Sequence, residues 1–282
     1  MKPFSLEHAN RWRLEELLGI IGSFEDKLAE EIKEQGMVVA QDYRNILLRF
    51  AAKSIVSTRE ICILCDHGYP DGALGISRSL YEHFIFIAFF ASKRSDPDFN
   101  VYVNDYFLDS EIQICKLAEV QKSQMTAEEA AEIATRKANA KAAASRDTRP
   151  LCWWTGLSSF QSVVEYVHKQ PIASGLENLS IRLQALYKLA CSVLHSNCFG
   201  NQIRLGLDDS FAGIDTTPLT NGHEFSLEFT ATTLIFIIGA VCTEFGLDHK
   251  PYTERLNDLA AFYKNTIATD SIENESSPLP NE

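Results

Sequence analysis

The sequence predicts an all-α protein, a single bundle of about eight or nine helices. Three features of its 282 residues lead to this fold class. Apolar residues recur three and four positions apart in nearly every segment, which is the period of an α-helix. No segment shows the sustained alternation of apolar and polar residues that is typical of a strand. Turn signals such as Gly68-Tyr69-Pro70-Asp71-Gly72 separate the periodic segments.

Local sequence signals indicate where the helices begin and end. Ser5 can cap the first helix and Gly36 can end it, while Asp98 can cap the fourth. Thr126 and Glu129 have the spacing of a capping box at the start of the fifth helix. The expected helices span residues 6–35, 41–66, 72–94, 99–123, 127–145, 158–169, 178–196, 225–246 and 252–267.

The fifth expected helix, 127–145, differs in kind from the others. It consists mostly of Ala, Glu, Lys and Arg, and Ile133 is its only large aliphatic residue. Helix propensity alone favours it, but it has little apolar surface to bury, so we expect an exposed, mobile arm inserted in the bundle. Residues 1–268 are expected to form one domain with a core over about 40–250, and the polar segment 269–282 to be disordered.

The charge distribution limits the partners of the chain. A net charge of −12 argues against binding of nucleic acid or anionic membrane through the whole surface. A local site on the arm is compatible with it, because five cations lie within fourteen residues that contain one acid: Arg136, Lys137, Lys141, Arg146 and Arg149. Arg136 and Lys137 are candidate contacts for RNA or for a partner protein. The alternative is that the arm is simply a solvated helix.

Cysteine usage and hydropathy predict the cellular compartment. The seven cysteines are odd in number and scattered, which suits reduced, buried thiols. The N-terminus has no apolar signal-peptide core, and the longest apolar stretch, residues 231–242, is shorter than the ~20 residues of a membrane span. We therefore expect a soluble cytoplasmic protein with no membrane partner.

Motifs for cofactors are missing from the sequence. It contains no phosphate-binding glycine loop and no dinucleotide fingerprint, so no nucleotide cofactor is expected. Cys62, Cys65 and His67 lie close together in the sequence, but a structural zinc site needs four ligands and no second close pair accompanies them. The sequence predicts neither a metal nor another cofactor.

A run of polar residues lies within the expected helix 72–94, one of the most apolar of the chain. Arg78 and Glu82 are four residues apart and therefore within ion-pair reach on one stripe of the helix, and His83 follows directly. Burial of such groups without partners costs several kcal/mol. Two interpretations are open: a buried pair that fixes helix register, or a pair that lines a polar cavity.

A second polar group lies near the end of the expected helix 178–196. Tyr187 and His195 share one side at helical spacing, and Ser192 precedes His195 by three residues. A histidine at a helix C-terminus is favoured in its protonated form. If His195 faces Arg78 and Glu82 across the bundle, the three side chains can bind an anion or combine an electrostatic clamp with an acid or base.

The stretch Asp71-Gly72-Ala73-Leu74-Gly75-Ile76-Ser77-Arg78-Ser79-Leu80-Tyr81-Glu82, followed by Tyr187, Ser192 and His195, resembles a bacterial family of uncharacterised helical proteins, domain of unknown function 5677. The family pairs an Arg-Ser-Leu-x-Glu helix with a later Ser-x-x-His helix. The resemblance covers roughly residues 40–250 and implies an all-helical fold. It implies no established activity, and it singles out Arg78, Glu82 and His195.

Arg78 and His83, with four residues between them, are also similar to the signature of HEPN-type helical ribonucleases. That resemblance implies a homodimer in which two Arg/His pairs meet and cleave RNA without a metal. At 100° per residue His83 lies about 140° around the helix from Arg78. A single chain therefore needs a distorted turn or a partner chain to bring them together.

Paired tryptophans form a further candidate binding feature. Trp153 and Trp154 follow Pro150 and can either anchor the loop to the bundle or stack a base or a sugar.

Two functions remain open from the sequence. The first is a HEPN-like, metal-independent endoribonuclease of a bacterial defence or toxin type, with Arg78 at the scissile phosphate and His83 or His195 in proton transfer. The second is a non-catalytic helical module that senses a small anionic ligand or a partner protein. In that module Arg78, Glu82 and His195 form a buried polar lock.

Overall fold

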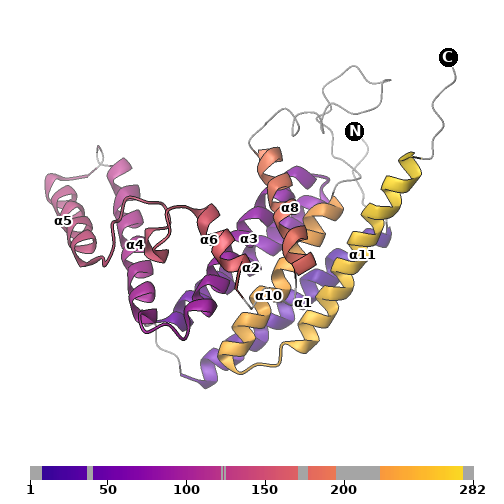
Figure 1. The fold of residues 1–282 in the computed structure, drawn as a ribbon, viewed down its shortest axis with the longest axis horizontal. Coiled ribbons are helices and arrows are strands. Elements are labelled where there is room, and N and C mark those ends of the chain that lie inside the picture. Colours follow the sequence, from indigo (N-terminus) through magenta and orange to yellow (C-terminus); the bar gives the residue numbers. More distant parts are fainter. Residues whose placement is uncertain are drawn as a thin grey trace, which may run out of the picture. The chain divides into compact units, whose positions relative to one another are not determined.

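The computed structural model describes residues 8–36, 41–121, 123, 125–170, 177–194 and 223–275 (Figure 1). Within these ranges every regular element is a helix, which confirms the predicted all-α fold class. The described elements are α1 (His8–Glu34), α2 (Tyr43–Asp66), α3 (Pro70–Lys93), α4 (Phe99–Val120), α5 (Ala127–Ala143), the short 3-10 helix η2 (Trp153–Thr155), α6 (Phe160–His168), α8 (Glu177–Leu194), α10 (His223–Phe245) and α11 (Lys250–Glu275).

The helix ends mostly lie within a few residues of their predicted positions. The predicted capping box is present at α5, where the Thr126 side chain accepts from the Glu129 backbone and the Glu129 carboxylate accepts from the Thr126 backbone. Asp98 occupies the predicted N-cap position of α4, but its side chain makes no capping hydrogen bond. α11 continues to Glu275, beyond the predicted end at about residue 267 and into the segment expected to be disordered.

The chain divides into two compact units, each described by itself below. Unit 1 consists of Met1–Met37, Leu48–Phe84 and Leu176–Glu282, and unit 2 of Val38–Leu47 and Ile85–Gly175. Both α2 and α3 pass from one unit to the other within the helix. Because these two boundaries fall inside continuous helices, no linker signal marks them, which is why the sequence suggests a single domain.

α10 is the central helix of unit 1. Every side chain from Ser226 to Leu234 is buried, whereas further along the helix the buried side chains, such as Ile238 and Val241, lie on one face. Gly246, with a φ of 72°, follows α10 in the left-handed conformation, and α11 folds back along α10 (Figure 1). Among the described helices α10 alone is long and apolar enough to cross a membrane, but 72% of that apolar window is buried within the structure, as in the core helix of a globular protein.

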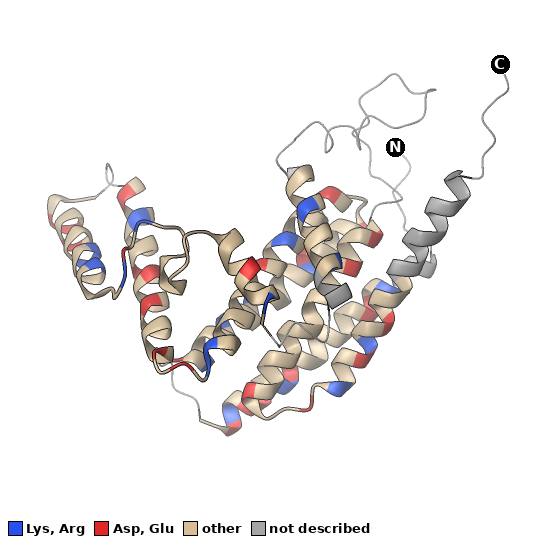
Figure 2. Cartoon of the chain, in the orientation of Figure 1, with Lys and Arg blue, Asp and Glu red and all other residues tan. Residues whose placement is uncertain are grey.

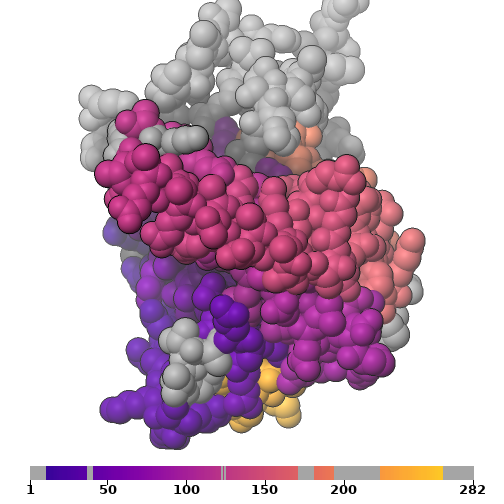
Figure 3. Space-filling view, turned by 90° about the vertical axis from the view of Figure 1, so that its left-hand side faces the viewer, coloured from indigo at the N-terminus to yellow at the C-terminus, as the bar shows by residue number. Residues whose placement is uncertain are grey.

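Unit 2 has an aromatic core around Trp154. The Trp154 indole stacks on Phe90 with ring centroids 5.1 Å apart and an interplanar angle of 12°. Phe89 and Tyr106 contact the same indole nearly edge-on. In the space-filling view the segment from α5 to α6 forms a continuous band, coloured pink to salmon (Figure 3).

The Ala-rich helix α5 lies beside α4 in unit 2 (Figure 1). Among its side chains only Ala140 is buried, which agrees with the exposed surface expected of this helix. Basic residues on α5 and acidic residues on α4 are visible in Figure 2. The Arg136 guanidinium Nη2 lies 2.7 Å from Glu111 Oε1, and Lys137 pairs with Glu119. Ion pairs therefore supplement the small apolar contact of the arm.

Candidate functional site

The candidate site lies in unit 1, where α3 meets α8. Nη2 of Arg78 is 3.1 Å from Oε1 of Glu82, one turn further along α3. Tyr187 of α8 donates a hydrogen bond from its hydroxyl to the same carboxylate oxygen at 3.4 Å, and its ring centroid is 5.5 Å from Cζ of Arg78. The side chains of Arg78 and Glu82 are 27% and 30% exposed, so the pair lies at the edge of the core and not inside it.

Aromatic packing holds Tyr187 in place beneath this pair. The Tyr81 ring is fully buried, and its centroid lies 4.9 Å from that of Tyr187 and 5.6 Å from that of Phe229 of α10. Tyr187 thus packs against a rigid aromatic side chain on one side and contacts Arg78 on the other. A side chain whose neighbours are fixed presents its polar groups in one orientation.

The electrostatics of the site follow from partial burial. Burial raises the pKa of the Glu82 carboxyl, and the neighbouring Arg78 charge and the Tyr187 hydroxyl oppose this rise without cancelling it. Burial likewise raises the pKa of Tyr187 to about 12, so its hydroxyl stays protonated. Burial disfavours the charge of Arg78, but Tyr187 and Glu82 outweigh that effect and the pKa of the guanidinium is raised. Arg78 is therefore a permanent cation.

Arg78 retains hydrogen-bonding capacity beyond this ion pair. Its Nε is buried and has no hydrogen-bond partner among the residues that the structure describes. Close to Arg78 along α3, Gly75 has no side chain and Ser79 has only a small one. A guanidinium presents five N–H donors in a planar fork that matches an oxyanion. A carboxyl with a raised pKa, such as that of Glu82, is suited to proton transfer.

His83 does not belong to this group in the described structure. Its Nδ1 is 3.1 Å from the Ser54 hydroxyl of α2, and its ring centroid is 5.5 Å from that of Phe50, also of α2. Burial, assisted by the positive charge of Lys53, lowers the pKa of His83 to about 4. His83 is thus a neutral packing residue at neutral pH, as the ~140° helical separation from Arg78 suggests.

A model of a family of unknown function, DUF5677, matches residues 44–211. The match covers more than half of the chain. The chain belongs to the DUF5677 family. The DUF5677 match is shorter than the expected 40–250 and ends before α10 and α11. It includes Arg78, Glu82 and Tyr187. Comparison with curated proteins finds no match, and comparison with solved structures finds none either.

Two further predicted site residues of the DUF5677 segment are Ser192 and His195. Ser192 is half-buried near the end of α8. His195 lies outside the described residues, so its position relative to Arg78 stays a prediction. Within the described part of the chain no group of three or more His, Cys, Asp or Glu side chains could hold a metal ion.

The paired tryptophans are enclosed in unit 2, which favours the anchoring role over the binding role among the two predicted for them. Trp153 is 2% exposed and donates from Nε1 to Asp109 at 2.7 Å. Trp154 is 3% exposed within the aromatic core of unit 2. Neither indole offers a face to a base or a sugar, because both are already enclosed.

The basic region of the arm is largely neutralised by ion pairs. Arg136 and Lys137 pair with acids of α4, as described above. Arg146 pairs with the fully buried Asp105, and Arg149 with Asp147. An RNA phosphate would have to compete with these carboxylates, so the local charge is weaker than the sequence suggests.

Two polar features next to the site were not found from the sequence. The first is a seam between α3 and α10. The Ser77 hydroxyl lies 2.9 Å from Thr230 Oγ1, and Ser226 donates its hydroxyl to the Pro70 carbonyl at 3.0 Å. Ser77, Ser226 and Thr230 are fully buried. Small hydroxyl side chains in an apolar helix give no sequence signal of their partners.

The second feature is an ion pair between α8 and α10. Arg182 donates from Nε and Nη2 to the two carboxylate oxygens of Glu228 at 2.8 and 2.6 Å. Glu228 is 3% exposed. The sequence signal of this pair is the carboxylate inside the apolar segment 225–246. As with Arg78, a charged side chain in an apolar helix is seldom buried without a partner.

Proposed function

We propose that this DUF5677 chain is a non-catalytic recognition module that binds a small anionic ligand at Arg78. The observation that supports this function is the partly exposed Arg78 side chain, whose guanidinium is held in one orientation by Glu82 and Tyr187. Preorganised donors bind an anion without a large entropic cost. Glu82 limits the affinity for simple anions, because its charge competes for the same guanidinium. A ligand with an anionic group and a hydrogen-bond donor for Glu82 fits best.

The position of His83 favours anion recognition over a ribonuclease in which Arg78 and His83 act together. An imidazole that faces Ser54 and has a pKa of about 4 is a poor acid or base at neutral pH. It is also directed toward α2, whereas Arg78 contacts α8. Within one chain, His83 is therefore not placed to act together with Arg78, as the HEPN-type motif requires.

A second candidate function retains the metal-independent endoribonuclease with a changed set of residues. The raised pKa of the Glu82 carboxyl beside Arg78 favours it. Arg78 would hold the scissile phosphate, and Glu82 would accept the proton of the attacking ribose hydroxyl. His195, if it faces them, would protonate the leaving oxygen. RNA as substrate, a homodimer of HEPN type and a role in bacterial defence belong to this proposal.

The compartment is part of both proposals. We expect the chain in the cytoplasm without a membrane partner, because its cysteines suit reduced thiols. This expectation is tested by fractionating cells that express the tagged full chain and assaying the soluble and membrane fractions.

One experiment separates the two functions. The full-length wild type, Arg78→Gln and Glu82→Gln are titrated with inorganic phosphate and with a phosphorylated ribonucleotide by calorimetry. The same proteins are incubated with single-stranded RNA in EDTA, and melting temperatures are recorded. Arg59→Gln is the matched control, because Arg59 also pairs with a glutamate of unit 1, Glu25.

The outcomes are distinct. Recognition predicts saturable binding that Arg78→Gln weakens by about tenfold or more, the loss of one charged hydrogen-bond partner, with no RNA cleavage. Cleavage that both site variants abolish, and Arg59→Gln does not, would establish the ribonuclease. A much lower melting temperature in Arg78→Gln, with no binding by the wild type, would make the cluster a structural lock and refute both functions.

A further inference from the structure

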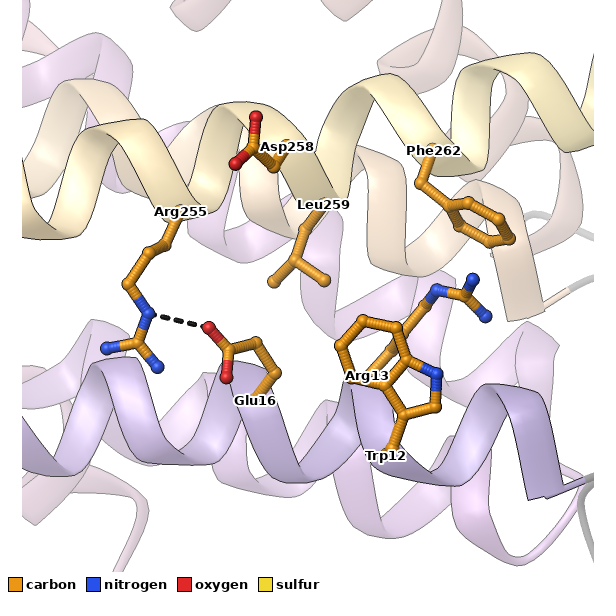
Figure 4. A pocket seen from close by; sticks show the side chains of 7 residues that line it. All are labelled: Trp12, Arg13, Glu16, Arg255, Asp258, Leu259 and Phe262. Carbon is orange, nitrogen blue, oxygen red and sulfur yellow. Dashed lines mark hydrogen bonds and ion pairs between the residues drawn. The ribbon is translucent and has the colours of Figure 1, made fainter.

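A hollow with mixed chemistry lies between α1 and α11, both in unit 1 (Figure 4). Its volume is about 260 Å³. Leu259 of α11 points into it, and Trp12 of α1 and Phe262 of α11 line one end (Figure 4). Trp12 is 52% exposed, whereas the other described large aromatic side chains of unit 1 mostly lie in its core. An indole face is therefore open to solvent at a concave, largely apolar surface.

A guanidinium accompanies these aromatic rings. Cζ of Arg13 lies 4.8 Å from the ring centroid of Trp12 and 3.2 Å from that of Phe262. Stacking on two rings holds the planar guanidinium at the aromatic end of the hollow. Because a guanidinium has five N–H donors, it can bind an anion in addition to any contact it already makes.

The two acidic side chains that line the hollow, Glu16 and Asp258, lie away from its aromatic end. Glu16 accepts from Nε of Arg255 at 2.6 Å, and that hydrogen bond lowers the pKa of Glu16. This pair closes the opposite end (Figure 4). Asp258 is exposed at the rim, and its carboxylate points away from Leu259 (Figure 4). Among the residues that line the hollow, Arg13 is the charged side chain next to the exposed indole.

We propose that the hollow between α1 and α11 binds a small aromatic carboxylate, with the ring against Trp12 and Leu259 and the carboxylate at Arg13. Small-molecule sites are typically concave and apolar with a few placed polar groups. The volume of about 260 Å³ is slightly below the usual range of about 300–1,000 Å³, which limits the ligand to one or two fused rings. The site is separate from Arg78 and independent of the function proposed there.

Calorimetry on the full-length protein tests the proposal with defined probes. Benzoate and naphthoate are titrated beside benzamide and naphthamide, which keep the rings and lack the charge. The wild type is compared with Arg13→Gln and with Trp12→Leu. Arg11→Gln is the matched control, because Arg11 is exposed on α1 and does not line the hollow. Circular dichroism and melting temperature establish that each variant is folded, and Arg13→Lys replaces Arg13→Gln if the latter is not.

We expect saturable binding of the carboxylates, weaker binding of the amides, and a loss of about tenfold in affinity in Arg13→Gln. Arg11→Gln should bind like the wild type. Quenching of Trp12 fluorescence provides an independent readout, because the other two tryptophans are buried in unit 2. Equal affinities for acid and amide, an unchanged affinity in Arg13→Gln, or no saturation at millimolar probe would each overturn the proposal.

Discussion

Burial determines what each ion pair of unit 1 contributes. The Glu228 carboxylate is enclosed by unit 1 and held by two hydrogen bonds from Arg182. The Glu25 carboxylate pairs with Arg59 at the surface, where both side chains are nearly half exposed. Water solvates an exposed carboxylate that has lost its partner, but it cannot reach a buried one. Equivalent substitutions should therefore have unequal effects.

Replacing Arg182 by Met tests this argument at the buried pair. The substitution keeps an apolar stem of similar length and leaves the Glu228 charge uncompensated. We expect the free energy of unfolding to fall by about 3 kcal/mol, the lower part of the range for a broken buried pair because Arg182 itself is partly exposed. Urea denaturation measures it. Arg59→Met, the control, should cost less than about 1 kcal/mol, and similar losses in the two variants would contradict the argument.

His83 gives the stability of unit 1 a defined pH dependence. Its pKa is about 4 in the folded chain, against about 6.5 for an unfolded histidine. Between these values the unfolded chain binds more protons, so the free energy of unfolding falls as the pH is lowered from about 6.5 towards 4. Burial also lowers the pKa of His223, which adds to this trend in unit 1, and that of His168, which has the same effect in unit 2.

The variant His83→Asn separates the contribution of His83 from the others. It removes the titrating group and keeps a polar side chain next to Ser54. We expect a smaller loss of stability between pH 7.5 and pH 5 than in the wild type, measured as the shift of the urea midpoint at both pH values. An identical loss in both proteins would show that His83 is not held in its neutral form.

At the scale of the element, single residues decide where helices stop. α10 ends at Phe245 because Gly246 adopts a φ of 72°, which other residues reach only with strain. Gly239, in contrast, lies within α10 in helical conformation, and a Cβ added there would meet nothing within 4 Å. The same chemical change should therefore have opposite effects at the two positions.

Substituting Ala at each glycine tests the helix end. Gly246→Ala should lower the free energy of unfolding by about 1 kcal/mol through strain in the left-handed conformation. Gly239→Ala should raise it by up to about 1 kcal/mol through higher helix propensity. Thermal and urea denaturation of both variants beside the wild type provide the values. Stabilisation by both substitutions would refute the assigned role of Gly246.

At the scale of the whole molecule, the structure protects most of its thiols. Of the six cysteines in the described part of the chain, five are buried and Cys191 is half-buried. Burial raises the pKa of Cys62 to about 12 and that of Cys242 to about 11. Thiols that are both enclosed and protonated do not react, because the thiolate is the nucleophile.

Alkylation of the native protein tests this protection. With iodoacetamide at neutral pH, peptide mapping by mass spectrometry should show Cys191 modified well before Cys62 or Cys242. Denaturation in urea should equalise the rates. Rapid modification of Cys62 in the folded chain would contradict the burial of α2 in unit 1.

Much of the candidate site could be predicted because its chemistry is local. Arg78 and Glu82 are one turn apart on one helix, so their pairing follows from helical spacing alone. Tyr187 belongs to a second polar group in the sequence, which it forms with Ser192 and His195. The burial of Trp154 depends on rings from α3 and α4, and the pairing of Arg182 with Glu228 joins residues 46 positions apart. Such contacts arise from packing between distant segments, for which a single sequence has no spacing rule.

The sequence by itself determined the helical fold class, most helix bounds and the capping box of α5, because periodicity, propensity and capping act within a few residues. Only the tertiary structure decided that α2 and α3 are shared between two units, that His83 faces Ser54, and that Arg78 is partly exposed. These properties depend on which helix lies against which face. The burial of apolar surface over the whole chain decides which helices pack together. A pattern of a few neighbouring residues does not reveal that arrangement.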